Sequence, residues 1–370
     1  MDPAVLSPAA SAPRRLIFHI GDHKTGSTAI QYAFARGTVR LNSGGPFYPG
    51  QLAHNYLRTH MKMLAKGSAD KQQDAGEALH KLARKIRKAG AGCSLISAEA
   101  LETVEPQSLR QAVDRFFTRS ADEIRVTAYV RPHLSRLLSS YTEQTKIGLT
   151  SESLADYANR MLDTGKFRYH PRFCAWRSAF GEAFILRPFV KAELHRGDVV
   201  ADLLRYGFGE EGFEITGPAP ANESLCLQDL MRLKLLQSHM QQHPQALRHA
   251  LGWEFARLIG TLPPPAAPVK LQLHRKLAQR LHDAYLEDAR AMDHDFFGGD
   301  PLLETELDQA LKVSVESPQK LDPAAHLEAE EIRSLTLMAQ MVSGMLENSS
   351  VNWVRRFRLQ RIADLKDGAP

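Results

Sequence analysis

Short apolar runs, separated by longer stretches with helical spacing, organise the first half of the chain. The runs at 16–20, 93–97 and 124–130 have the length of buried strands, and 183–189 is a fourth run of the same kind. Between the first two runs, residues 71–90 repeat apolar side chains at the spacing of one helix face. This alternation predicts βαβ units whose strands form a mainly parallel sheet with helices on both faces.

The second half of the chain is dominated by helical patterns. Residues 223–240 and 270–292 are predicted helices, and the sequence FFGGDP at 296–301 predicts the end of the compact domain. Beyond it, residues 325–363 carry another amphipathic pattern, which we interpret as a helix for packing or self-association. If the chain forms a homo-oligomer, we expect this C-terminal helix to mediate it.

These patterns divide the chain of 370 residues into three segments. Residues 1–13, rich in Pro, Ala and Ser, predict a disordered leader. Residues 14–300 form the predicted main domain, and residues 301–370 form a helical extension at the C-terminus. The predicted fold class is α/β, with a central, mainly parallel sheet and a helix-rich C-terminal half.

Composition and charge narrow the classes of function. With 43% apolar and 24% charged residues, the chain falls in the range of globular proteins. Its 47 basic residues are offset by 42 acidic ones spread along the chain, which predicts a pocket for a small polyanion and no nucleic-acid partner. No run approaches the roughly 18 apolar residues that cross a bilayer, and the N-terminus lacks a secretion pattern. These features predict a cytoplasmic protein without stable membrane insertion.

The three cysteines, Cys93, Cys174 and Cys226, lie far apart in the sequence. They form neither a CxxC pair nor an even-numbered framework, which argues against a zinc site and against a disulfide scaffold. We therefore expect reduced, mostly buried thiols and no metal.

The segment from Gly21 to Thr28, GDHKTGST, combines the features of a phosphate-binding loop. It follows the first predicted strand and leads into a helical pattern that begins near Ser27. Glycines allow backbone N–H groups to close on an anion, and a helix N-terminus adds unsatisfied donors and positive potential. In the loop GxxxxGK[ST] of nucleotide triphosphatases, lysine directly follows the second glycine. Here Ser27 holds that position and Lys24 lies two residues before Gly26, so the chemistry of the loop differs.

The run KTGST, after a strand and before a helix, resembles the 5′-phosphosulfate loop of sulfotransferases that use 3′-phosphoadenosine-5′-phosphosulfate (PAPS). The wider sequence HIG-x-HKTGST-x-IQ is similar to the bacterial branch of that superfamily. The resemblance implies a P-loop NTPase-like fold with three layers. It also implies that Lys24 contacts the oxygen that bridges sulfur and phosphorus. The residues that would hold the 5′-phosphate are Thr25, Gly26, Ser27 and Thr28.

A second match lies at the end of the third predicted strand. Arg131 directly follows this strand, and Ser139 lies eight residues later, about two turns along the next helix. This spacing resembles the family's 3′-phosphate site, where an arginine offers paired donors and a serine hydroxyl adds another. The resemblance covers about residues 15–300. An Arg-Lys-Gly loop like that of the animal cytosolic enzymes is missing from the sequence, so no further 3′-phosphate contact is assigned.

Sulfuryl transfer to an alcohol needs a base near the acceptor hydroxyl. His54 lies in the region where this superfamily often places a catalytic histidine or glutamate. Glu99 is the second candidate because it follows a predicted parallel strand, and loops at the carboxyl ends of such strands line ligand crevices. His23, inside the phosphate loop, is the third candidate.

The residues and the resemblance together predict an enzyme that transfers the sulfuryl group from PAPS and releases 3′-phosphoadenosine-5′-phosphate (PAP). The acceptor is a hydroxyl or amino group of a glycan, a lipid or a small metabolite. One alternative is a P-loop nucleotide kinase or NTPase, which would need magnesium ligands and a lysine after Gly26. The other is a non-catalytic PAP-binding protein that uses the C-terminal helix for interaction.

Overall fold

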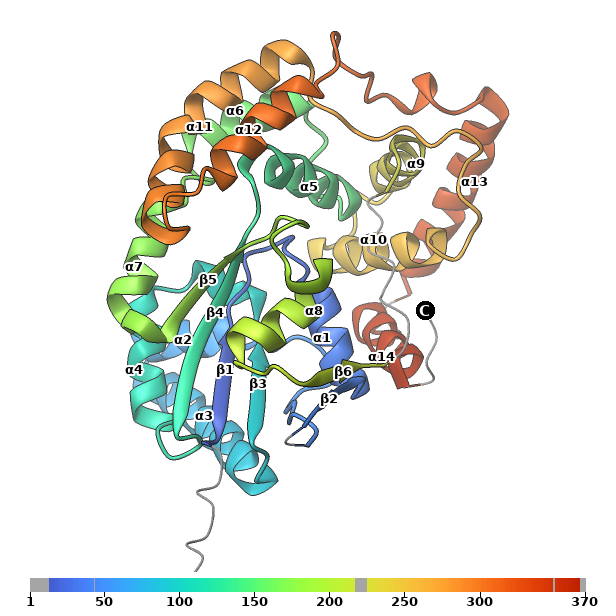
Figure 1. Cartoon of the computed structure of the whole chain (residues 1–370). Helices are drawn as coiled ribbons and strands as arrows, with labels where there is room; N and C mark the ends of the chain where they lie inside the picture. Colours follow the sequence, from blue (N-terminus) through green and yellow to red (C-terminus); the bar gives the residue numbers. More distant parts are fainter. Residues whose placement is uncertain (1–12, 43, 217–224, 349, 367–370) are drawn as a thin grey trace, which may run out of the picture. The chain divides into compact units, whose positions relative to one another are not determined.

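The computed structural model describes residues 13–42, 44–216, 225–348 and 350–366 (Figure 1). Apart from residue 13, the predicted leader lies outside these described residues. The described chain forms two compact units. Unit 1 contains residues from 13–129, 175–187 and 191–216, and unit 2 contains residues from 130–174, 188–190 and 225–366.

Unit 1 is built on a four-stranded sheet in the order β3-β1-β4-β5 (Figure 1). The strands are β1 (Arg15–His19), β3 (Cys93–Ser97), β4 (Glu123–Val130) and β5 (Phe184–Pro188). Strand β1 pairs in parallel with β3 on one side and with β4 on the other, as the sequence predicted. Its residues Leu16 to Phe18 are at most 1% exposed, which explains the continuous apolar run of a strand that is covered on both faces.

Helices and one small sheet complete unit 1. The α-helices are α1 (Ser27–Arg36), α2 (Leu57–Lys66), α3 (Ala69–Ala89), α4 (Pro106–Phe116) and α8 (Val199–Asp202). Three 3₁₀-helices and a π-helical turn are also present: η1 (Glu99–Thr103), η2 (Gly181–Ala183), η3 (His195–Gly197) and η4 (Leu203–Gly207). Helix α1 packs on α8, and α3 packs with α2 and α4. Strands β2 (Val39–Leu41) and β6 (Phe213–Ile215) pair antiparallel, which ties two distant parts of the chain together.

Unit 2 is helical in its described part, which agrees with the predicted helix-rich second half. Its helices are α5 (His133–Lys146), α6 (Leu154–Asp163), α9 (Leu227–Ser238), α10 (Gln245–Ile259), α11 (Arg275–Phe296), α12 (Leu302–Lys312), η5 (Pro323–Ala325), α13 (Ala329–Leu346) and α14 (Trp353–Lys366). Helix α7 (His170–Phe180) begins in unit 2 and ends in unit 1. Helix α12 packs on α11 and α5, and the domain boundary predicted at residue 300 stays a prediction.

The C-terminal segment 325–363 contains two helices instead of the single one that its pattern suggested. Helix α13 ends at Leu346, and α14 begins at Trp353. Ala339 of α13 and Trp353 of α14 pack with the apolar side chains of α9 and α10. On its other side, α13 leaves four large apolar side chains more than half exposed: Leu337, Met338, Met341 and Met345. Self-association through this segment stays a prediction.

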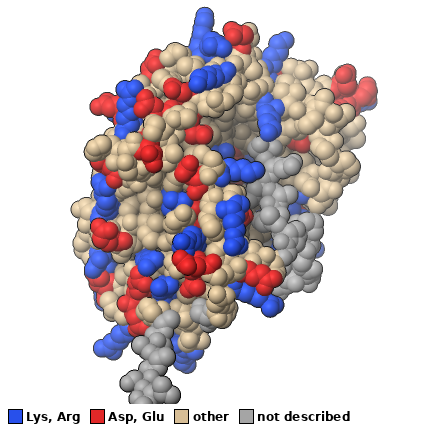
Figure 2. All heavy atoms as spheres, in the orientation of Figure 1, with Lys and Arg blue, Asp and Glu red and all other residues tan. Residues whose placement is uncertain are grey.

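The surface charge and the length of the helices bear on the predictions about nucleic-acid binding and membrane insertion. Figure 2 shows basic and acidic side chains interspersed over the viewed face. In the part of the chain that the structure describes, every helix is too short or too polar to cross a membrane. The interspersed surface charge agrees with the sequence, which contains 47 basic and 42 acidic residues.

Candidate functional site

The predicted phosphate loop, residues 21–28, follows β1, and the hydrogen-bond ladder between β1 and β4 extends into its first residues. The Asp22 amide donates to the Tyr129 carbonyl at 3.2 Å, and the Tyr129 amide donates to the Gly21 carbonyl at 3.0 Å. Gly21 has a φ of +88°, a conformation that favours glycine. A Cβ on Gly21 would also lie only 3.0 Å from the Cα of Glu99. Both features make glycine necessary at this position, and they place the backbone of Glu99 against the start of the loop.

The loop then turns sharply into helix α1. Lys24 has a φ of +65° and Gly26 a φ of +79°, so two residues in the left-handed region direct the chain into the helix. Such a conformation is uncommon for a residue other than glycine. The Thr25 hydroxyl donates to the Asp22 carbonyl at 2.5 Å, which closes the turn from inside. The side chain of Lys24 is half-buried, and those of Thr25 and Ser27 are buried.

The first turn of α1 presents backbone donors that no group among the described residues accepts. Among the described residues, the N–H groups of Gly26, Ser27 and Thr28 have no acceptor, and α1 has no acidic residue in its first turn. Free N–H groups at a helix N-terminus, together with the positive end of the helix dipole, form a binding site for an anion. Three of the four residues predicted to hold the 5′-phosphate therefore provide donors suited to that role.

Two carboxylates fix the other side of the loop at His23. The His23 amide donates to Asp22 Oδ1 at 2.9 Å and to Glu102 Oε2 at 2.7 Å. The same Glu102 oxygen lies 3.3 Å from His23 Nδ1, and the Glu102 side chain is only 10% exposed. The His23 amide is therefore occupied by acidic groups, whereas the amides at the start of α1 stay available. Neither Asp22 nor Glu102 was identified from the sequence.

His54, the first candidate base, lies in the core of unit 1 with no exposed surface. Its Nδ1 lies 3.2 Å from the Ser97 carbonyl oxygen, and its Nε2 has no hydrogen-bond partner among the described residues. A Cβ on Gly50 would come within 2.7 Å of this Nε2, so the backbone of Gly50 covers it. Burial lowers the pKa of His54 from 6.5 to about 4. The hydrogen bond with Ser97 raises this pKa, and the nearby charge of Lys85 lowers it.

A second buried histidine at the end of β1 was missed in the sequence. His19 is fully buried, and its Nδ1 lies 2.9 Å from the Ser97 hydroxyl. That hydroxyl also accepts a hydrogen bond from Gln31 of α1 at 3.2 Å. Ser97 thus links strand β1, strand β3 and helix α1 directly beneath the loop. The signal in the sequence was a polar residue at the end of each apolar run, which parallel register brings together as the pair His19 and Ser97.

We expect the protein to lose stability in mild acid because of His19 and His54. Burial lowers the pKa of His19 to about 4, as it does for His54. Between pH 6.5 and 4 the unfolded chain therefore binds protons that the folded chain does not, so stability is complete above pH 6.5 and falls as the pH is lowered. Over this pH range, the lowered pKa of each histidine reduces the free energy of unfolding by up to about 3 kcal/mol. Urea unfolding at several pH values measures the slope of the unfolding free energy against pH. His54→Asn should reduce this slope.

The control for this prediction is His80→Asn, which replaces an exposed histidine of α3. Its slope of unfolding free energy against pH should equal that of the wild type between pH 6.5 and 4. A His54→Asn slope identical to both would contradict the neutral, buried state of His54.

Glu99, the second candidate base, lies at the first residue of η1 and is partly exposed. It follows β3 closely, and the Ala98 amide donates to the His19 carbonyl at 2.9 Å. The parallel register that pairs His19 with Ser97 thus brings the ends of β1 and β3 to one edge of the sheet. Glu99 and the phosphate loop therefore lie side by side, whereas the ring of His54 is enclosed beneath.

In unit 2, Arg131 and Ser139 meet as their spacing predicted. Arg131 Nη1 donates to the Ser139 hydroxyl at 3.2 Å, and Arg131 Nε donates to the Ser135 hydroxyl at 3.2 Å. The guanidinium also lies 5.8 Å from the centre of the Phe189 ring. Burial lowers the pKa of Arg131, as does the nearby guanidinium of Arg136, but an arginine keeps its charge at neutral pH. The result is an oriented, partly buried cation with two hydroxyls, of which the sequence analysis found only Ser139.

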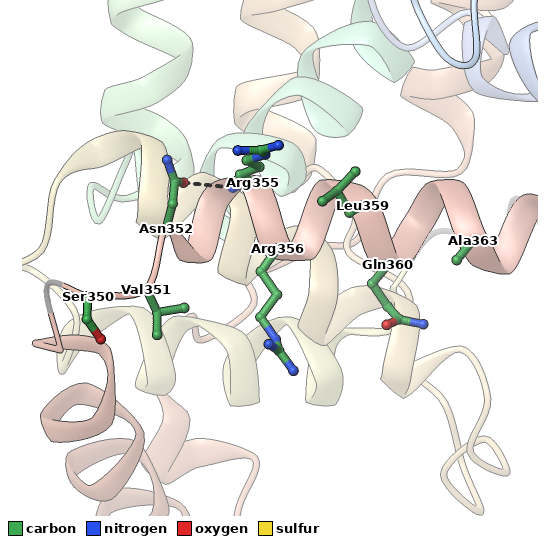
Figure 3. Close-up of a pocket in the computed structure, with 8 residues that line it drawn as sticks. All are labelled: Ser350, Val351, Asn352, Arg355, Arg356, Leu359, Gln360 and Ala363. Atoms are coloured by element: carbon green, nitrogen blue, oxygen red, sulfur yellow. Dashed lines mark hydrogen bonds between the residues drawn. The ribbon is translucent and has the colours of Figure 1, made fainter.

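A surface hollow lies on α14, also in unit 2 (Figure 3). Its lining residues are Ser350, Val351, Asn352, Arg355, Arg356, Leu359, Gln360 and Ala363. The Arg355 amide donates to Asn352 Oδ1 at 3.0 Å, which caps the start of the helix. The side chains of Arg355 and Arg356 point to different sides of α14 (Figure 3), so they do not converge on one ligand. We assign no function to this hollow.

Comparisons of this chain with family models, with curated proteins and with solved structures found no match. The candidate residues are therefore described by the geometry within each unit. In unit 1 they are the donors at the start of α1, and in unit 2 they are Arg131 with its two hydroxyl partners.

Proposed function

We propose that this chain is a sulfotransferase that moves the sulfuryl group of PAPS to a hydroxyl or amino acceptor, on a P-loop NTPase-like fold. The observation that carries the proposal is the set of three N–H groups, on Gly26, Ser27 and Thr28, that have no acceptor among the described residues. Because Ser27 stands where a triphosphatase has its lysine, the loop favours a phosphosulfate over a magnesium-bound triphosphate.

The proposed reaction is a direct transfer. The oxygen or nitrogen of the acceptor attacks sulfur, the bond between sulfur and the bridging oxygen breaks, and the bridging oxygen keeps the electron pair as a phosphate oxygen of PAP. Lys24 would stabilise the negative charge that develops on the bridging oxygen, and the helix donors would hold the 5′-phosphate. The acceptor gives up its proton to a base.

For the base we propose Glu99 over His54. Glu99 is partly exposed and lies against Gly21 at the start of the loop. His54 is fully buried, and its low pKa makes it a weak acceptor of a proton at neutral pH. A buried ring beneath the sheet edge suits a positioning role, in which His54 holds the backbone of Ser97 and so the end of β3.

In the proposed complex, Arg131 and Ser139 bind the 3′-phosphate that distinguishes PAPS from other adenine nucleotides. Arg131 offers planar, charged donors, and Ser139 accepts from it, which leaves the hydroxyl proton of Ser139 to donate to phosphate. The preference for a 3′-phosphate is thus the property that separates this proposal from a kinase or an NTPase.

Ligand-dependent melting of the full chain tests the proposal. PAP should raise the melting temperature more than ATP with magnesium and more than adenosine 5′-phosphate, because it adds contacts to the native state. A larger shift with ATP and magnesium would instead support the kinase or NTPase. Turnover is then followed as PAP formed from PAPS with a panel of phenols, sugars and amines. Tight PAP binding without turnover of any acceptor would favour a non-catalytic PAP-binding protein.

A further inference from the structure

Three potential metal ligands from two helices converge in unit 2, apart from the residues of the proposed reaction. His170 and Cys174 lie four residues apart on α7, so both face the same side of that helix. Asp295 comes from the end of α11. The three ligand atoms, His170 Nε2, Cys174 Sγ and a carboxylate oxygen of Asp295, all lie within 4.8 Å of one another.

The spacing of these atoms fits one bound ion. His170 Nε2 and Cys174 Sγ are 3.4 Å apart. Zinc binds a thiolate at about 2.3 Å and an imidazole nitrogen at about 2.0 Å, so two such ligands at a tetrahedral angle lie about 3.5 Å apart. Asp295 Oδ2 lies 2.6 Å from His170 Nε2, a hydrogen bond that would open by about 0.7 Å to admit the ion. That change lies within the reach of a partly exposed carboxylate.

Neighbouring contacts hold the two helices in place for this arrangement. Asp288 of α11 accepts the amide of Tyr169 at 2.8 Å and the amide of His170 at 3.0 Å. The same carboxylate pairs with the buried His133 at 2.9 Å. The backbone of His170 is therefore hydrogen-bonded to α11 at Asp288, about two helical turns before Asp295. Such second contacts, which orient a ligand without touching the ion, accompany metal sites in proteins.

We propose that His170, Cys174 and Asp295 bind one Zn²⁺ ion, with water as the fourth ligand. A set of one sulfur, one nitrogen and one oxygen ligand suits zinc better than magnesium or calcium, which prefer oxygen alone. Binding releases the thiol proton of Cys174 to solvent, and no redox step is involved. The ion would cross-link the start of α7 to the end of α11. No sequence pattern indicated this site, because Asp295 is remote from His170 and Cys174 along the chain and no CxxC pair is present.

Cobalt substitution of the full-length protein tests this site independently of sulfuryl transfer. The chain is stripped with a chelator and titrated with Co²⁺, whose bond to a thiolate gives a charge-transfer band in the near ultraviolet. We expect one equivalent of Co²⁺ to produce the band, one equivalent of Zn²⁺ to abolish it, and Zn²⁺ to slow alkylation of Cys174. Cys174→Ser should remove the band and weaken Zn²⁺ binding at least tenfold.

The matched control is Cys226→Ser, which replaces a buried cysteine whose sulfur lies against Asp229 on α9. It should keep the band and the zinc affinity of the wild type. Asp295→Asn is the second test variant, and circular dichroism of each metal-free variant confirms that it is folded. If the wild type binds no stoichiometric Co²⁺ or Zn²⁺, or if Cys174→Ser binds either ion as tightly as the wild type, the proposal is wrong.

Discussion

Replacing Lys24 with methionine is expected to lower the rate of sulfuryl transfer by about 100- to 1,000-fold while PAP binding changes only a few-fold. The reason is that the bridging oxygen gains its full negative charge only as its bond to sulfur breaks, so a cation beside it acts mainly on the transition state. Methionine keeps much of the length of the side chain and meets the same backbone cost at a φ of +65°. The effect therefore reports the lost charge and not a changed loop.

The measurement is PAP formation from PAPS at saturating nucleotide, with the affinity for PAP determined separately. Lys81→Met, an exposed lysine of α3, is the matched control and should behave as the wild type. Lys24→Arg should recover part of the rate, since it restores the charge with a different shape. Turnover of Lys24→Met equal to that of the wild type would remove Lys24 from the reaction. An equal loss of PAP affinity would assign it to binding only.

The strands around the site could be predicted closely because each is a short apolar run. Strand β3 spans Cys93–Ser97, as predicted. Strand β4 begins one residue earlier than predicted, and β1 lies one residue earlier than predicted at both ends. The reason is physical: a strand buried on both faces needs an uninterrupted apolar sequence, and it ends where polar or glycine residues begin. The small sheet of β2 and β6 gave no such signal. Its strands have three residues each and are held by pairing across a long stretch of chain.

The candidate site was predictable where spacing along one element decides the contact. Arg131 and Ser139 meet because Arg131 lies just before α5 and Ser139 lies about two turns along that helix. Gly26 was recognised because glycines allow backbone N–H groups to close on an anion. Burial could not be read in the same way. His54 was the first candidate base and Glu99 the second, yet packing encloses the ring of His54, and the register of two strands places Glu99 beside Gly21.

Replacing Arg131 with alanine is expected to weaken PAP binding by about 10- to 100-fold, the loss typical of a hydrogen-bonded charge. Binding of adenosine 5′-phosphate, which lacks the 3′-phosphate, should change little. Ser139→Ala should cost less, about fivefold, because a neutral hydroxyl makes a weaker contact with phosphate. Titration calorimetry of both ligands with each variant gives the two affinities and their ratio.

The ratio of the two affinities separates a phosphate contact from a structural role. Arg131 donates hydrogen bonds to Ser135 and Ser139, so its removal could also loosen the start of α5. Such loosening would weaken the binding of both nucleotides by the same factor. Arg290→Ala, which removes an exposed arginine of α11 paired with Glu304, is the control for a general change of charge in unit 2 and should leave the ratio unchanged. Arg131→Lys keeps the charge but loses the planar pair of donors, so we expect an intermediate ratio. If Arg131→Ala lowers both affinities by the same factor, the 3′-phosphate is recognised elsewhere, and the resemblance of Arg131 and Ser139 to a PAPS site loses its meaning.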